Sequence, residues 1–75
     1  MNQMGVVLFH SSSMALRAEK VLKTAGFTIK LIPTPRQLSS DCGISLQFHW
    51  DEQEPIQELL QRSGVEVARI CPLPD

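Results

Sequence analysis

A short segment of the sequence holds two side chains that could do chemistry, Arg36 and Cys42, with Gly43 directly after the cysteine. A cysteine reacts as its thiolate, which nearby positive charge stabilises. An arginine offers a permanent charge and a planar set of donors that suits carboxylate, phosphate or sulfate. The segment therefore predicts either a thiol that carries sulfur or a site that binds a small anion.

Two prolines, Pro33 and Pro35, precede Arg36 and stiffen this segment. Proline fixes its own φ and keeps the residue before it out of helical conformations. We therefore expect an extended, ordered connection that holds Arg36 in place. A solvated arginine, or one bonded to Asp41, explains Arg36 equally well, and the sequence leaves these alternatives open.

Ser11, Ser12 and Ser13 form a second group of candidates, because they stand between a strand-like run and a helical pattern. Any of these hydroxyls can cap the start of the helix, and the free N–H groups there can also bind an anion. Capping is the more common role of such serines. His10, directly before them, could move a proton or could simply end the strand.

Hydrophobic spacing predicts the elements that position these residues. Strands are expected over residues 4–10, 27–32, 42–50 and 65–70, and helices over residues 12–25 and about 51–63. Alternation is clearest over 42–50, where Cys42, Ile44 and Leu46 share one face. Asp51 and Glu54 have the spacing of a capping box, and residues 71–75 are expected to leave regular pairing.

The order βαββαβ predicts an α+β fold, a ferredoxin-like sandwich with two helices on one face of a four-stranded antiparallel sheet in the order 4-1-3-2. No change in composition divides the chain, so residues 1–75 are expected to form a single domain. The residues expected to supply most of the core are Val6, Leu8, Leu22, Ile29, Leu31, Ile44, Leu46, Phe48, Ile56, Leu59, Leu60 and Val67.

In this topology the first two strands run parallel, so the end of the first strand, the start of the first helix and the loop over residues 33–43 share one rim. That rim gathers the serines, Arg36 and Cys42, and it places Cys71 at the opposite rim. The other face of the sheet is expected to carry Val7 or Phe9 on a central strand, which favours a homodimer.

Composition excludes several other functions. A net charge of −1, with positive and negative residues mixed along the chain, predicts no nucleic-acid partner. The longest apolar run, residues 6–9, is far shorter than the roughly 20 residues that cross a membrane. The N-terminus lacks a basic secretory signal, so we expect a cytoplasmic protein with two reduced thiols. We find no motif for a metal or a cofactor, and no acid–base pair that would make the chain an enzyme in its own right.

Each cysteine has alternatives. Cys42 is in phase with the apolar face of its strand, so it could be a small core residue. Cys71 opens Cys-Pro-Leu-Pro, which is similar to the reactive Cys-Pro-x-Pro of the small TusA-like sulfur carriers. In those carriers a helix follows, whereas only Asp75 follows Pro74 here. Cys71 is therefore the second candidate thiol.

The sequence resembles the small family of putative selenium/sulfur carrier-like proteins over roughly residues 6–67. The likeness rests on Phe9-x-Ser11, Ala15-Leu16-Arg17-Ala18-Glu19-Lys20, Gly26, the Ile-Pro-x-Pro-Arg run at 32–36 and the Ser-x-x-Cys-Gly run at 39–43. The resemblance implies that Cys42 carries sulfur or selenium as a persulfide-type species and that Pro33, Pro35, Arg36 and Gly43 shape its site. It also implies a donor enzyme of the cysteine desulfurase type and an acceptor enzyme as partners, with no cofactor.

Overall fold

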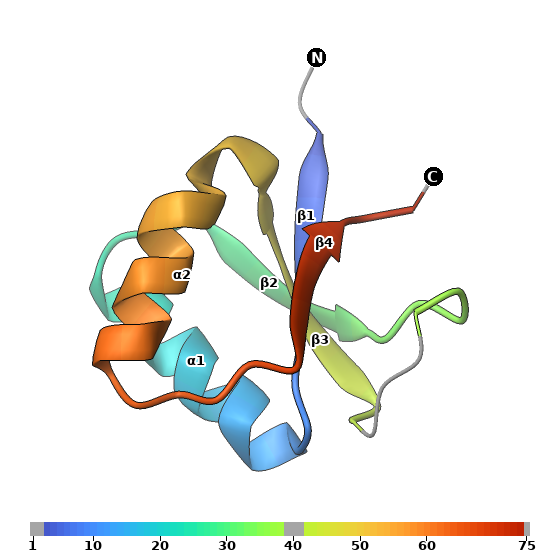
Figure 1. Ribbon diagram of the computed structural model, residues 1–75, viewed down its shortest axis with the longest axis horizontal. Helices are drawn as coiled ribbons and strands as arrows, with labels where there is room; N and C mark the ends of the chain where they lie inside the picture. The colour runs from blue at the N-terminus through green and yellow to red at the C-terminus, as the bar shows by residue number, and fades with distance from the viewer. Residues whose placement is uncertain (1–2, 39–41, 75) are drawn as a thin grey trace.

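The computed structural model describes residues 3–38 and 42–74 and confirms the predicted order of elements. These elements are β1 (Met4–Leu8), α1 (Ser12–Thr24), β2 (Ile29–Pro33), β3 (Ile44–His49), the 3-10 helix η1 (Trp50–Glu52), α2 (Gln53–Arg62) and β4 (Arg69–Pro72). The strand order β2-β3-β1-β4 is the predicted order read from the other edge, and every neighbouring pair is antiparallel. Figure 1 shows both helices on one face of this sheet. The α+β, ferredoxin-like sandwich is confirmed.

Both helices end in the same capping motif, which needs a glycine. Gly64 follows α2 with a φ of +72°, in the left-handed region that residues with a Cβ avoid. The next N–H, that of Val65, then donates to the carbonyl of Leu60 at 3.0 Å. α1 ends likewise, with Phe27 in the position of Val65. These two apolar residues therefore close helices and do not begin strands.

The second and fourth strands consequently start later than predicted. β2 begins at Ile29, and β4 covers Arg69–Pro72 in place of residues 65–70. The prediction that the tail cannot pair was wrong, because Cys71 and Pro72 pair with β1. Proline fits here because β4 is an edge strand, where its missing N–H can face away from the sheet.

The two faces of β1 are the reverse of those predicted. Val7 and Phe9 pack on the helix side, whereas Val6 and Leu8 lie on the opposite face, which we call the open face. All four side chains are buried, with exposed fractions of 1% or less. A run of four apolar residues has no period, so its sequence could not assign the faces.

The open face is itself partly covered. Leu38, Leu73 and Ile32 pack against Val6, Leu8 and Cys71 in a second apolar cluster. Figure 1 shows the loop after β2 and the C-terminal tail on this side of the sheet, away from the helices. Val7 and Phe9 are therefore not on the face that a dimer was expected to use, and a homodimer stays a prediction.

Most of the predicted core is confirmed. Its fully buried members are Val6, Leu8, Leu22, Leu46, Phe48, Ile56 and Leu60. Its remaining members, Ile29, Leu31, Ile44, Leu59 and Val67, are partly buried and pack against the helix-side cluster.

The start of α2 differs from the prediction. η1 precedes α2, and the N-cap residue Glu52 makes no side-chain capping bond, so the capping box of Asp51 and Glu54 was wrong. The N–H of Gln53 instead donates to the carbonyl of Trp50. A tight 3-10 turn thus satisfies a backbone donor that a capping side chain would otherwise take.

Candidate functional site

The predicted rim is present at one end of the strands, where β1 ends and β3 begins. Val7 of β1 lies opposite Leu46 of β3, so the residues at the start of β3 lie beside the chain that leaves β1. That chain enters α1 at Ser12. Figure 1 shows the end of β1, the start of α1 and the start of β3 at the same end of the molecule. The topology therefore brings the serines before α1 and the start of β3 to the same end of the sheet.

Ser11 is the residue that caps α1. Its Oγ accepts a hydrogen bond from the N–H of Met14 at 3.4 Å, and its own φ and ψ are extended. Ser12 and Ser13 lie in the first turn, which contains no acidic residue, and all three serines are exposed. The positive end of the helix dipole at this rim is thus open to solvent.

Cys42 is buried, with 4% of its surface exposed, and its side chain belongs to the helix-side core. Gly43, beside it, is exposed. A Cβ built on Gly43 would meet no atom within 4 Å, and its φ is outside the left-handed region. The structure therefore gives Gly43 no steric requirement for glycine.

A threonine that the sequence did not single out fixes the backbone of Cys42. The Oγ1 of Thr34 donates to the Cys42 carbonyl at 2.8 Å and lies 2.7 Å from the Oγ of Ser45. Because a hydroxyl has one proton and Thr34 gives its proton to the carbonyl, Ser45 is the donor in the second bond. The N–H of Thr34 also donates to the Gly43 carbonyl at 3.0 Å.

We call Thr34, Ser45 and the Cys42 carbonyl the hydroxyl clamp. Ser45 has no exposed surface, although it lies on a strand between apolar neighbours. A buried hydroxyl without a hydrogen-bond partner destabilises the fold, so a serine in a buried strand is expected to have an acceptor nearby. That requirement is the signal that could have identified the clamp in the sequence.

Arg36 is exposed and occupies a turn that the N–H of Leu38 closes by donating to the Pro35 carbonyl at 3.0 Å. Leu38 packs on the open face, so this turn lies on that face. Cys42 packs on the other face, with the helices. Arg36 and Cys42 thus belong to one loop region but to different sides of the sheet. The alternative pairing of Arg36 with Asp41 lies outside the described residues.

One of three comparisons with known proteins identifies a family for this chain. Residues 4–72 match the protein family described as "Putative Se/S carrier protein-like", which covers the chain from β1 to β4. The chain belongs to this family. A search of curated proteins and a search of solved structures each found no match.

The second thiol of this Se/S carrier-like chain is placed differently from the first. Cys71 lies in β4 opposite Val6, with 8% of its surface exposed, in the apolar cluster of the open face. Both cysteines are thiols and not a disulfide. The sheet therefore separates the side chains of Cys42 and Cys71.

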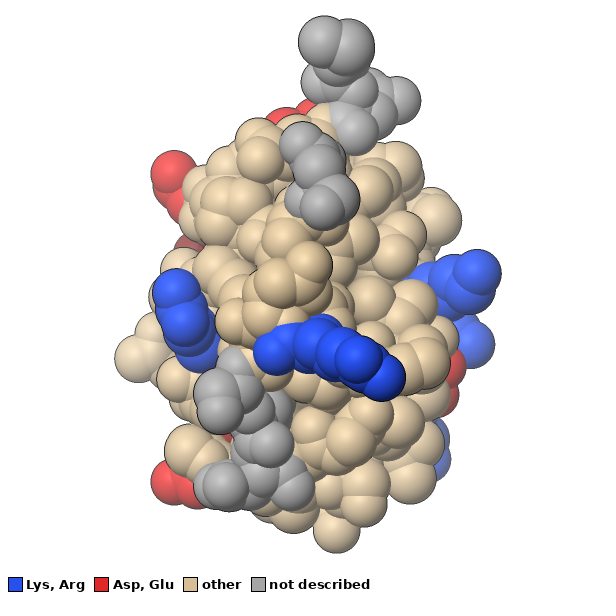
Figure 2. Space-filling view, turned by 90° about the vertical axis from the view of Figure 1, so that its right-hand side faces the viewer, with Lys and Arg blue, Asp and Glu red and all other residues tan. Residues whose placement is uncertain are grey.

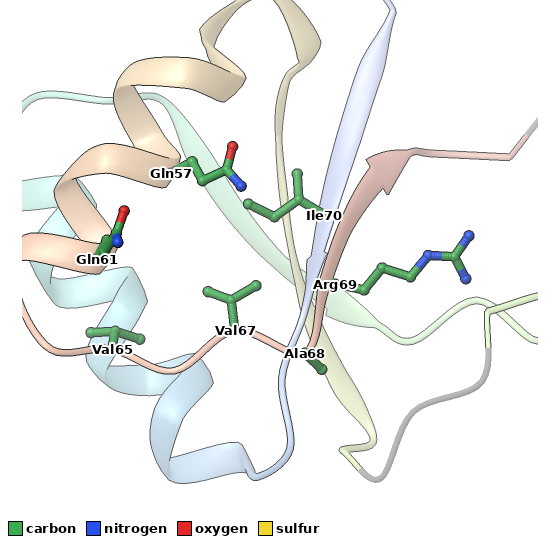
Figure 3. A pocket seen from close by; sticks show the side chains of 7 residues that line it. All are labelled: Gln57, Gln61, Val65, Val67, Ala68, Arg69 and Ile70. Atoms are coloured by element: carbon green, nitrogen blue, oxygen red, sulfur yellow. The ribbon is translucent and has the colours of Figure 1, made fainter.

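The Se/S carrier-like chain also has a shallow pocket of about 390 Å³ between α2 and the approach to β4. In Figure 3, Gln57 and Gln61 of α2 and Val67 and Ile70 line this space; Arg69 also borders the pocket, but its side chain extends away from α2. Its lining contains none of the rim residues. The pocket is therefore separate from the candidate site.

Within residues 3–38 and 42–74, no helix has the length and apolar character that crossing a bilayer requires. Over the same ranges, the structure gathers no three His, Cys, Asp or Glu side chains as ligands for a metal ion.

Proposed function

We propose that Cys42 carries sulfur or selenium between a donor enzyme of the cysteine desulfurase type and an acceptor enzyme. The observation that carries this proposal is the hydroxyl clamp, which fixes the Cys42 backbone at the rim in a chain of the Se/S carrier-like family. The start of α1 lies at the same rim and presents there the positive end of its helix dipole.

The transfer needs no cofactor. The Cys42 thiolate attacks the outer sulfur of a persulfide on the donor, a new S–S bond forms at Cys42, and the donor cysteine leaves as its thiolate. An acceptor thiolate then attacks the outer sulfur in the same way and releases Cys42. Each step exchanges one S–S bond for another, so atoms and electrons balance.

Burial of Cys42 has a consequence for this proposal. With only 4% of its surface exposed, the residue cannot meet a donor unless the side chains over it move. The same cover would shield a loaded sulfur from water and from other thiols. We therefore expect loading to be slow with small donors and loss of the loaded sulfur to be slow as well.

Mass spectrometry of the loaded protein tests the proposal. The wild type and the variants Cys42→Ser and Cys71→Ser are incubated with cysteine persulfide, and peptides that contain each cysteine are weighed. We expect a gain of one sulfur atom at Cys42 in the wild type and in Cys71→Ser, and no gain at position 42 in Cys42→Ser. Alkylation rates of each thiol across pH give an independent measure of reactivity.

Circular dichroism of each variant serves as the control for folding. Loading at Cys71 with none at Cys42 would make the C-terminal cysteine the carrier. If neither thiol gains sulfur while all three proteins stay folded, the carrier proposal is wrong.

A second candidate function is favoured by the same burial. If Cys42 is only a core residue, the exposed Arg36 and the open start of α1 still suit a small anion. The chain would then be a binding or regulatory module that responds to an anion such as phosphate or sulfate.

Calorimetry with phosphate and with sulfate separates the two functions. A binding module predicts unchanged affinity in Cys42→Ser and affinity weakened about tenfold or more in Arg36→Ala, because a charge-assisted hydrogen bond contributes about 1.5–3 kcal/mol. Lys20→Ala, which removes an exposed charge on α1, is the matched control. Absence of heat with either anion would remove this second candidate.

A further inference from the structure

The open face carries positive charge from three separate elements. Lys30 lies between Ile29 and Leu31, which pack on the helix side, so strand alternation places Lys30 on the open face. Arg69 lies opposite Leu8, whose side chain is on the open face. Figure 3 shows Arg69 directed away from α2.

Arg36 adds a third charge, because it lies in the turn that folds over this face through Leu38. We call Lys30, Arg36 and Arg69 the basic belt, and all three are exposed. Figure 2 views this side of the molecule, with Lys and Arg side chains at its middle and flanks and Asp and Glu at its margins.

The described carboxylates lie elsewhere. They belong to α1, η1, α2 and the loop before β4, and they are Glu19, Asp51, Glu52, Glu54, Glu58 and Glu66. Asp41 and Asp75 lie outside the described residues. The three cations of the open face thus meet no described carboxylate there, whereas α1, η1, α2 and the loop before β4 carry these six carboxylates together with four cations, Arg17, Lys20, Lys23 and Arg62.

Between the belt residues lie three apolar side chains, and Gln47 is beside them, opposite Lys30 and Val6. Ile32, Leu38 and Leu73 are only partly buried, and they pack over the buried cluster beneath them. Protein interfaces commonly combine an apolar centre with a charged rim, and arginine is enriched in them. The open face therefore has the composition of an interface.

We propose that the open face docks a partner protein through an acidic surface, whose carboxylates pair with the basic belt around a shared apolar centre. Complementary charge of this kind speeds association and sets orientation. The inference concerns the sheet face and not the thiol, so it stands or falls independently of the chemistry of Cys42.

Other occupants fit less well. Nucleic acid usually meets more cations than three, and it offers nothing to the apolar centre. A dimer that packs open face on open face would oppose like charges. A head-to-tail contact, with the belt on the next copy's acidic α2, is heterologous, so it would form a ring or an open filament and not a two-fold dimer. A different protein with an acidic surface remains the best match.

The test uses a synthetic peptide of Glu-Glu-Leu repeats as the probe, with Gln-Gln-Leu repeats and duplex DNA as controls. Binding to the isotope-labelled protein is followed by amide chemical shifts. We expect the acidic peptide to shift amides on the open face, and we expect this binding to weaken at about 0.5 M salt, where charges are screened within a few ångströms.

Charge reversal locates the site. Lys30→Glu/Arg69→Glu is expected to weaken peptide binding about tenfold or more, whereas Lys20→Glu/Lys23→Glu, with the same change in net charge on α1, is expected to bind as the wild type does. Dispersed amide spectra confirm that each variant is folded. Lys30→Gln/Arg69→Gln should give an intermediate affinity.

Several results would overturn the inference. These are no shift with the acidic peptide, equal binding of the Gln-Gln-Leu peptide, tighter binding of DNA, or equal loss of affinity in the two reversal variants. Wild-type sedimentation that grows with concentration, and that Lys30→Glu/Arg69→Glu abolishes, would assign the face to a second copy of the chain instead.

Discussion

Replacing Gly5 with alanine is expected to destabilise the fold by at least about 2 kcal/mol. A Cβ at this position would lie 2.6 Å from the Cζ of Phe48 and 2.6 Å from the Cε3 of Trp50. Phe48 has no exposed surface, and its ring is 6.0 Å from that of Trp50, so the ring cannot move aside without disturbing the core. The pair has room only because position 5 lacks a side chain.

Thermal unfolding measures this effect. For a domain of this size a loss of about 2 kcal/mol lowers Tm by about 8–16 °C. Gly43→Ala is the matched control, because its added Cβ meets no atom within 4 Å, and we expect its Tm to stay near that of the wild type. An equal loss of stability in both variants would show that the crowding at Gly5 is not the cause.

Replacing Thr34 with valine is expected to cost about 1–3 kcal/mol of stability and to raise the reactivity of Cys42. Valine keeps the shape of threonine but removes the hydroxyl, which leaves the buried Ser45 hydroxyl and the Cys42 carbonyl without that partner. Because the hydroxyl clamp fixes the start of β3, its loss should let the Cys42 side chain reach solvent more often.

Denaturant unfolding and alkylation rates give the two readouts. Thr34→Ser retains the hydroxyl and should restore slow alkylation of Cys42, while Cys71, on the other face, serves as the internal reference. Thr34→Val/Ser45→Ala should cost less than the sum of the single changes, because they share one bond. Additive costs would mean that Thr34 and Ser45 act separately.

The fold could be predicted because each element has its own period and its own boundary signal. Strict alternation over residues 42–50 identified β3, and the glycines after each helix marked its end. The starts of β2 and β4, however, were predicted too early, because an apolar residue follows each of these glycines. Phe27 and Val65 are apolar because they close the helix caps, whereas the sequence pattern predicts them as the first residues of strands.

Small residues in the core were also hard to recognise. Ala15 and Ala18 are fully buried on α1, and neither is among the residues that the sequence pattern assigns to the core. Alanine contributes little apolar surface, so a pattern of large side chains does not identify it. What buries Ala15 is the close approach of the core to α1, which depends on the assembled fold.

The candidate site was predictable as a set of segments but not as a set of contacts. Strand order alone brings the serines, the loop and Cys42 to one rim. Which side of the sheet Arg36 faces depends on the turn after Pro35, and the clamp depends on where the hydroxyls of Thr34 and Ser45 point. These directions arise from tertiary packing, which the order of residues does not encode locally.

The position of Trp50 gives the protein a built-in optical reporter. It is the only tryptophan in the sequence, and it follows β3 at the end away from Cys42. Six strand residues separate the two ends of β3, a distance of about 20 Å. Tryptophan emission should therefore follow the packing of Phe48 and unfolding of the sheet, and should be insensitive to what is bound to the thiol.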